Sequence, residues 1–185
     1  MDDHIILGVD PGTQIMGYAL LKTTAVKSEL ITLDVLNLKK LPDQPTKLKT
    51  IFEFVTELID QYHPDILAIE EPFLGKSAQS MLKLGRAQGV VMAACIHKGL
   101  EINEYSPRKI KQSVTGNGNA AKEQVSAMLQ RMYPLPNDIK YLDATDALAV
   151  ALCHHLQNRV QLGPRQHFSG WESFLSKNAD RIIEK

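Results

Sequence analysis

The 185-residue sequence contains no apolar stretch long enough to span a membrane, since a spanning helix needs about 20 predominantly apolar residues. Residues 1–4 are acidic overall and lead directly into an apolar segment, whereas a secretory signal begins with basic residues. The chain has only two cysteines, Cys95 and Cys153, and both lie in apolar segments. We therefore expect buried free thiols in a cytoplasmic protein that is not inserted in a membrane.

The sequence also has no net charge, because 21 Lys and Arg residues balance 21 Asp and Glu residues. Taken alone, this balance argues against a nucleic-acid partner. The charges are segregated along the chain, however: residues 74–131 contain nine basic and three acidic residues, a net charge of +6. Either a basic face that binds a polyanion or a set of solvated helix faces would produce this pattern, and charge alone does not separate the two.

The order of the predicted elements indicates a mixed α/β fold. Hydrophobic runs bounded by turn residues predict strands at 5–10, 15–22, 28–38, 65–70 and 101–105. Helical spacing predicts helices at 46–62, 77–98, 107–113, 120–132 and about 141–158. Three strands in sequence form an antiparallel meander, and the helical crossovers that follow make the last two strands parallel. The expected fold is a five-stranded mixed sheet flanked by helices.

One domain accounts for most of the length. We expect it to cover residues 1–158. The remaining residues, 159–185, are polar, include Gly163, Pro164 and the only tryptophan, Trp171, and are expected to form a C-terminal extension of uncertain order.

Four acidic residues stand where a metal site could form. Asp10 and Glu70 each end an apolar strand, and Asp143 and Asp146 lie three residues apart, on one face of a predicted helix. Converging carboxylates repel one another, and Mg²⁺ prefers such oxygen ligands. Two Mg²⁺ ions would remove the repulsion and support phosphodiester hydrolysis. Taken singly, Asp10 could belong to an ordinary turn and Asp143 could be a helix N-cap.

The four acids lie in or near motifs that resemble those of a known family. These motifs are Gly8-Val9-Asp10-Pro11-Gly12, Ala68-Ile69-Glu70, Leu82-Lys83-Leu84-Gly85-Arg86-Ala87-Gln88-Gly89 and Asp143-Ala144-Thr145-Asp146-Ala147-Leu148-Ala149. Their order and spacing over residues 4–156 resemble the RuvC family of bacterial Holliday-junction resolvases. The resemblance implies a ribonuclease H-like fold, a homodimer, and paired symmetric nicking of four-way DNA junctions in recombination and repair.

The resemblance also implies the cofactor and a further partner. In the family pattern, Asp10, Glu70, Asp143 and Asp146 bind Mg²⁺, or Mn²⁺ in its place, with two ions per active site. The branch-migration complex RuvAB is the implied partner. Helix 77–98 is where the family dimerises, and its small residues are compatible with close approach of a second helix.

Five residues are candidates for DNA contacts. Phe73 matches a family aromatic that stacks on a base at the junction, although a core phenylalanine is the alternative. Lys111 and Lys122 match family basic residues near the scissile phosphate. Arg108 and Lys109 are expected to add phosphate contacts, with an ordinary solvated helix face as the alternative.

Other interpretations remain open at this stage. Residues 9–13 also resemble the first phosphate loop of actin-like and sugar-kinase ATPases, although those proteins are typically twice as long. A junction-binding protein without catalysis, or a related nuclease acting on other nucleic acids, would share the fold. Glu71, beside Glu70, leaves the choice of ligand ambiguous by one position, and strand alternation allows only one of the two to face the metals.

Overall fold

The computed structural model describes residues 3–72, 77–135 and 142–161. The elements follow in the predicted order: β1 (His4–Asp10), β2 (Ile15–Thr23), β3 (Ser28–Asn37), α1 (Gln44–Tyr62), β4 (Ile66–Glu70), α2 (Ala78–His97), β5 (Glu101–Tyr105), α3 (Pro107–Thr115), α4 (Lys122–Met132) and α5 (Leu142–Gln161). The predicted strands and helices are confirmed, with boundaries that differ by a few residues. Helix α5 continues to Gln161, three residues beyond the predicted limit of the nuclease domain.

The five strands form one mixed sheet in the order β3-β2-β1-β4-β5. Strand β2 is antiparallel to both β1 and β3. Strand β4 is parallel to β1 and to β5, as the helical crossovers require. The predicted fold class is therefore confirmed, and β1 is the central strand whose carboxyl end lies beside that of β4.

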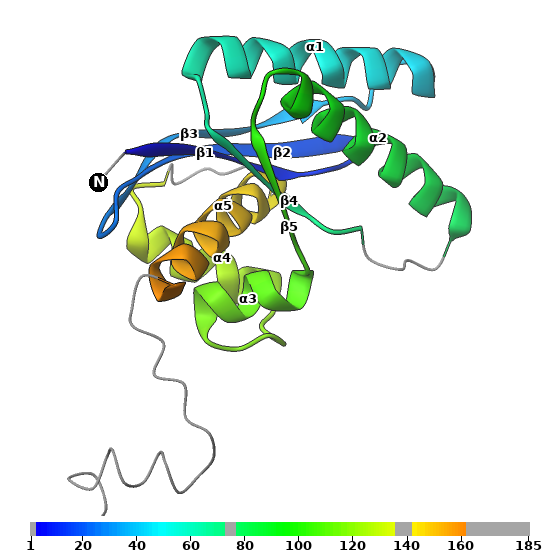
Figure 1. The fold of residues 1–185 in the computed structure, drawn as a ribbon. Coiled ribbons are helices and arrows are strands. Elements are labelled where there is room, and N and C mark those ends of the chain that lie inside the picture. Colours follow the sequence, from blue (N-terminus) through cyan, green and yellow to red (C-terminus); the bar gives the residue numbers. More distant parts are fainter. Residues whose placement is uncertain (1–2, 73–76, 136–141, 162–185) are drawn as a thin grey trace, which may run out of the picture.

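Helices cover both faces of this sheet (Figure 1). Helices α1 and α2 bury one face in a core that includes Leu7, Val9 and Leu67, while α3, α4 and α5 bury the other around Ile6 and Ala68. Alternate side chains of β1 and β4 thus enter different cores, because successive strand residues point to opposite faces.

Two glycines allow α5 to lie directly on the sheet. A Cβ atom at Gly8 would come within 2.2 Å of the carbonyl oxygen of Ala147, and one at Gly17 within 1.9 Å of the carbonyl oxygen of Asp143. Both distances are far below van der Waals contact, so any side chain here would push the helix away. Small residues on the helix, Ala147 and Ala151, complete the close approach. The position of the α5 N-terminus is therefore set by Gly17.

We expect Gly17→Ala to destabilise the fold by about 1–3 kcal/mol, because the added methyl group collides with the backbone of α5. Glu29→Ala, on the exposed edge strand β3, is the control, because surface substitutions usually change stability by less than about 0.5 kcal/mol. Urea unfolding monitored by circular dichroism measures both changes. Wild-type stability in Gly17→Ala would contradict this account of how α5 is positioned.

Candidate active site

Asp10 and Glu70 extend from the same edge of the sheet towards the same face. The register pairs Val9 with Ile69 in the parallel β1–β4 ladder, so the next residues, Asp10 and Glu70, are neighbours at the strand ends. Val9 and Ile69 enter the core under α1 and α2. Alternation therefore directs Asp10 and Glu70 to the opposite face, which α5 covers.

Asp143 and Asp146 reach this edge from the first turn of α5. Gly17, which lies under the Asp143 carbonyl, pairs with Asp10 across the β1–β2 ladder. The helix therefore begins over the end of β1. The spacing of three residues puts both side chains on one helix face. The structure thus brings together the four predicted acids, which we call the acidic site.

The pKa shifts of Asp10 and Glu70 show that the charges of the acidic site interact. Burial raises the pKa of Asp10 well above its ordinary value, and the charges of Glu70, Asp146 and Asp143 raise it further. Burial and the charge of Asp146 likewise raise the pKa of Glu70. Both shifts mean that the folded protein disfavours the ionised carboxyl groups. A cation at this edge would relieve the repulsion.

Two lysines border the acidic site. The ammonium group of Lys122, at the start of α4, forms an ion pair with Asp146. Burial lowers the pKa of Lys122, but its hydrogen bond to Asp146 and the charges of Asp10 and Glu70 raise it overall. Lys111, on α3, lowers the pKa of Glu70 by its charge. Both lysines line a small cleft of about 40 Å³ together with Glu70 and Asp146.

The donor set fits a hard divalent cation. In the part of the chain that the structure describes, no three His, Cys, Asp or Glu side chains are already arranged closely enough to hold a metal ion. The chemistry nevertheless matches, because four carboxylates supply oxygen ligands, and burial together with neighbouring negative charge raises the pKa values of Asp10 and Glu70. The Lys122 ammonium group supplies part of the missing positive charge at Asp146.

Two other predicted residues, Arg108 and Lys109, lie on α3 and are not among the described residues that line the cleft. Arg108 packs its side chain against Gly118, in the turn between α3 and α4. The ammonium group of Lys109 lies 5.2 Å from the centre of the Tyr105 ring, in a cation–π contact. Glu71 is exposed just after β4, and alternation directs it away from the face that carries Glu70. Phe73 lies outside the described residues.

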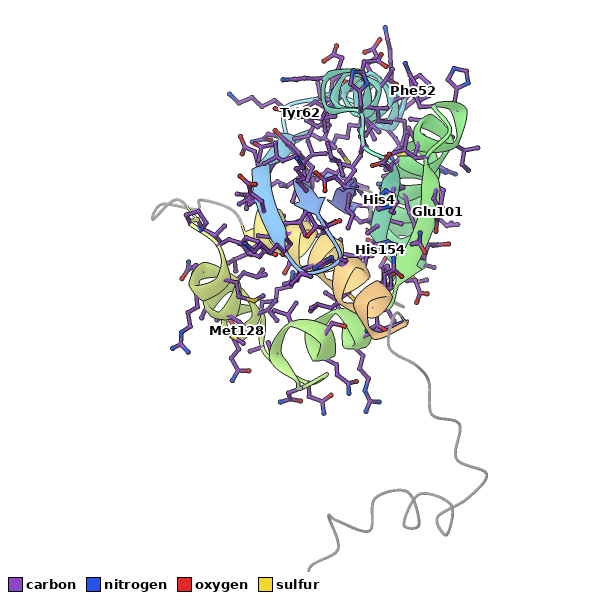
Figure 2. The ribbon with its side chains drawn as sticks, turned by 60° about the vertical axis from the view of Figure 1, so that its left-hand side comes forward. His4, Phe52, Tyr62, Glu101, Met128 and His154 are labelled. Carbon is purple, nitrogen blue, oxygen red and sulfur yellow. The ribbon has the colours of Figure 1, made fainter. Side chains whose placement is uncertain are left out.

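A polar cluster, buried at Tyr105 and His154, joins α5 to the end of β5. The hydroxyl group of Tyr105 hydrogen-bonds with Nδ1 of His154 at 2.9 Å, and Nε2 of His154 lies 2.8 Å from Nδ2 of Asn158. Figure 2 shows His154 on α5, near β5, the strand that carries Glu101. Burial lowers the pKa of His154, so its neutral form is favoured in the folded protein. The cluster holds in place the helix that supplies two of the site acids.

Two further polar residues near the site were not among the sequence predictions. Lys47 on α1 donates a hydrogen bond to the carbonyl of Thr13, and Gln88 on α2 donates one to the carbonyl of Glu70. The available signal for Lys47 was its spacing, since it falls on the same helical face as the buried Ile51 and Val55. For Gln88 the signal was a long amide side chain on the face that buries Val91 and Cys95.

An acidic cluster at this edge of a ribonuclease H-like sheet, bordered by lysines, defines a nuclease of that fold. Comparison with known proteins gives the family. The profile of the family described as "Crossover junction endodeoxyribonuclease RuvC" matches residues 6–154. The chain belongs to the RuvC family. This membership favours the nuclease over the ATP-binding alternative, and the family comprises metal-dependent enzymes.

Curated relatives of the same description are similar over nearly the whole chain. The protein of Cytophaga hutchinsonii is 52% identical over 97% of this chain and 88% of its own length. That of Christiangramia forsetii is 51% identical over 97% of this chain and 93% of its own. Among solved structures, Thermus thermophilus RuvC in complex with Holliday junction substrate superposes with a TM-score of 0.79 at 28% identity, covering 85% of this chain and 96% of that one. None of the described helices is long and apolar enough to cross a membrane.

The raised pKa of Asp10 predicts a pH-dependent effect of Asp10→Asn on stability. Wild-type Asp10 binds its proton more tightly when folded, so the wild-type protein loses stability as the pH rises from the ordinary value of 3.8 through the raised value. In EDTA at neutral pH we therefore expect the variant to be more stable than wild type. The difference should disappear as the pH falls towards 3.8.

Urea unfolding at neutral and acid pH measures this difference. A variant less stable than wild type at neutral pH would show that the Asp10 carboxylate is not under repulsion.

Proposed function

We propose that this protein is a Mg²⁺-dependent endonuclease that resolves four-way DNA junctions by paired symmetric nicks. Membership of the RuvC family supports the activity, as does the similarity to a RuvC structure described as a complex with Holliday junction substrate. The observation that carries the proposal is the acidic site. There the carboxyl ends of β1 and β4 and the first turn of α5 bring four carboxylates together.

The chemistry that we assign to the acidic site depends on divalent cations. Asp10, Glu70, Asp143 and Asp146 would hold them, with Mg²⁺ as the preferred ion, Mn²⁺ as a substitute, and two ions per site. Bound ions of this kind activate a water molecule and stabilise the leaving oxygen of a phosphodiester. Asp10 interacts with Glu70 on β4 and with both acids of α5, and it would be one of the residues that hold the ions.

Lysines at the rim would bind the phosphate group to be cleaved. Lys122 and Lys111 lie beside Glu70 and Asp146 in the cleft, so a phosphate bound there meets positive charge next to the metal ligands. Arg108 and Lys109, both exposed on α3, would add contacts to neighbouring phosphates. For Phe73 we propose stacking on an unpaired base, which the family resemblance alone supports.

A cleavage assay tests the function directly. Mobile four-way junctions, duplex, single strands and RNA–DNA hybrids are incubated with the protein and Mg²⁺. We expect symmetric nicks in two opposing strands of the junction and at least about a hundredfold slower cleavage of the other substrates. We also expect Asp10→Asn to lower junction cleavage by more than about a hundredfold, because it removes a metal ligand.

The same variant should still bind the junction, because the loss of a negative charge reduces repulsion of the phosphates. An electrophoretic mobility assay in EDTA or Ca²⁺ measures this binding. Near wild-type nicking by Asp10→Asn would overturn the metal-site assignment. Equal cleavage of duplex and junction would overturn the substrate assignment.

We propose that the enzyme is a homodimer that pairs through α2. One stripe of the outward face of this helix is apolar or small, with Leu82 63% and Ile96 60% exposed, and it lies beside the exposed Lys83 and Arg86. Between Leu82 and Ile96 lie Gly85 and Gly89, where an added Cβ would meet nothing within 4 Å in the same subunit. A stripe of small residues between two large apolar ones lets a second helix approach closely. Two active sites in one dimer would account for paired nicks.

Gly85→Arg should separate the dimer without unfolding the subunit, because the new side chain has open space within its own chain. Sedimentation velocity should show a dimer for wild type and at least a tenfold higher dissociation constant for the variant. Glu29→Arg places the same side chain on the exposed edge strand β3, with a larger change in charge, and as the control should remain dimeric. A dimeric Gly85→Arg protein would exclude this face of α2.

The proposal also includes a partner and a cellular location. The family resemblance alone suggests RuvAB as a partner. A cytoplasmic location agrees with Cys95 and Cys153, both buried and free of disulfides.

A further inference from the structure

Two buried polar side chains on the opposite face of the sheet form hydrogen bonds with backbone that carries or follows a site acid. Among the described residues, α1 and α2 each bury one long polar or charged side chain: Lys47 is 8% exposed and Gln88 is 5% exposed. Lys47 bonds to the carbonyl of Thr13, three residues after Asp10, and Gln88 bonds to the carbonyl of Glu70. Burying an ammonium or amide group is costly unless it is paired, so these positions require an explanation beyond packing.

Lys47 holds the turn that follows Asp10. Its Nζ atom donates a hydrogen bond to the carbonyl oxygen of Thr13 at 3.0 Å. The turn is tight, because a Cβ atom at Gly12 would lie 1.7 Å from the carbonyl oxygen of Ile15. The carbonyl of Gln14 is held separately by the backbone amide of Leu38 at 2.9 Å. Lys47 therefore fixes the part of the turn nearer to Asp10.

The start of α1 is itself anchored, so Lys47 extends from a fixed point. The Asp43 side chain caps the helix by accepting a hydrogen bond from the backbone amide of Thr46 at 2.8 Å. Hydrogen bonds from the side chain and then the backbone amide of Thr46 lower the pKa of Asp43. A capped first turn gives the Lys47 side chain a defined origin opposite the Thr13 carbonyl.

Gln88 holds the strand end that carries Glu70. Its Nε2 group donates to the carbonyl oxygen of Glu70 at 3.5 Å and to Oε2 of Glu104 at 2.9 Å. Glu104 lies on β5 and pairs with Ile69 on β4. The amide therefore joins the ends of both parallel strands to α2, directly behind the site acid.

We propose that Lys47 and Gln88 are positioning residues that set the backbone from which Asp10 and Glu70 enter the acidic site. The inference rests on the proposed metal-dependent function and deepens it. Asp10 and Glu70 repel each other, so a free strand end would relax by moving them apart. The two buried hydrogen bonds oppose this movement from the rear face. Outer partners of metal ligands typically contribute 10–100-fold in metal affinity or activity.

The experiment compares two Lys→Met substitutions in the same pair of helices. Lys47→Met removes the hydrogen bond to the turn at a similar side-chain length. Lys98→Met breaks the pair of Lys98 with Asp60, which links the other ends of α1 and α2 at 2.6 Å. Calorimetric titration of Mn²⁺ into each DNA-free protein, well below its melting temperature, gives the metal dissociation constant. We expect it to rise about tenfold in Lys47→Met and to stay at the wild-type value in Lys98→Met.

Gln88→Met gives an independent measurement, with about tenfold weaker Mn²⁺ binding also expected. Lys47→Arg should restore wild-type affinity, because it keeps both the charge and the donors. Junction affinity in EDTA, and its dependence on salt, should not change in Lys47→Met, since the ammonium group faces backbone rather than DNA. A smaller salt dependence would make Lys47 a phosphate contact and overturn the positioning role.

Different results would overturn the proposed metal site and the positioning role of Lys47 and Gln88. If wild-type protein bound no Mn²⁺, the proposed metal site would be wrong, and the positioning role with it. If wild type bound Mn²⁺ and Lys47→Met, Gln88→Met and Lys98→Met all matched it, the positioning role alone would be overturned. Equal weakening in Lys47→Met and Lys98→Met would assign the loss to general destabilisation and also overturn it.

Discussion

Helix α5 can carry Asp143 and Asp146 to the end of β1 only because two glycines below it lack side chains. At Gly17 the carbonyl of Asp143 occupies the space of a Cβ atom, and at Gly8 the carbonyl of Ala147 does the same. This close contact sets the separation between the helix pair and the strand acids. The positions of Asp143 and Asp146 relative to Asp10 and Glu70 depend on that separation.

The short distance between α5 and the strand ends also places carboxylates near one another, which destabilises their ionised forms. Carboxylates that are buried and near one another resist ionisation, as the raised pKa values of Asp10 and Glu70 indicate. The fold opposes this repulsion with the ammonium group of Lys122 on one side and with buried hydrogen bonds behind the strand ends on the other. Such strain is characteristic of a site built to bind cations, because the charge that destabilises the free protein becomes favourable once the cation is bound.

Sequence reasoning identified the parts of the site that follow from local periodicity. Asp10 and Glu70 each end an apolar strand, and alternation along parallel neighbours gives their common direction. The spacing of Asp143 and Asp146 is a helical property that needs no tertiary information. Alternation also distinguishes Glu70 from Glu71, but only when the face of β4 that α5 covers is known. The sequence alone does not show which face that is.

Contacts between distant elements could not be derived in this way. Lys122 and Asp146 are 24 residues apart, and their pairing depends on how α4 packs against α5. The bond from Lys47 to Thr13 spans 34 residues and two strands. Helical spacing can show that Lys47 is buried, but the backbone carbonyl that it meets depends on the packing of α1 against the sheet. Gln88 was visible only as part of a family-like motif.

The central claim is that the four carboxylates form one divalent-cation site, and Mn²⁺-soaked crystals test it most directly. Anomalous diffraction recorded at the manganese absorption edge should show bound Mn²⁺ between Asp10, Glu70 and the α5 pair, with the Lys122 ammonium group moved away from Asp146. Strong manganese peaks elsewhere on the protein, with the Lys122–Asp146 pair intact and no density between the four acids, would contradict the account.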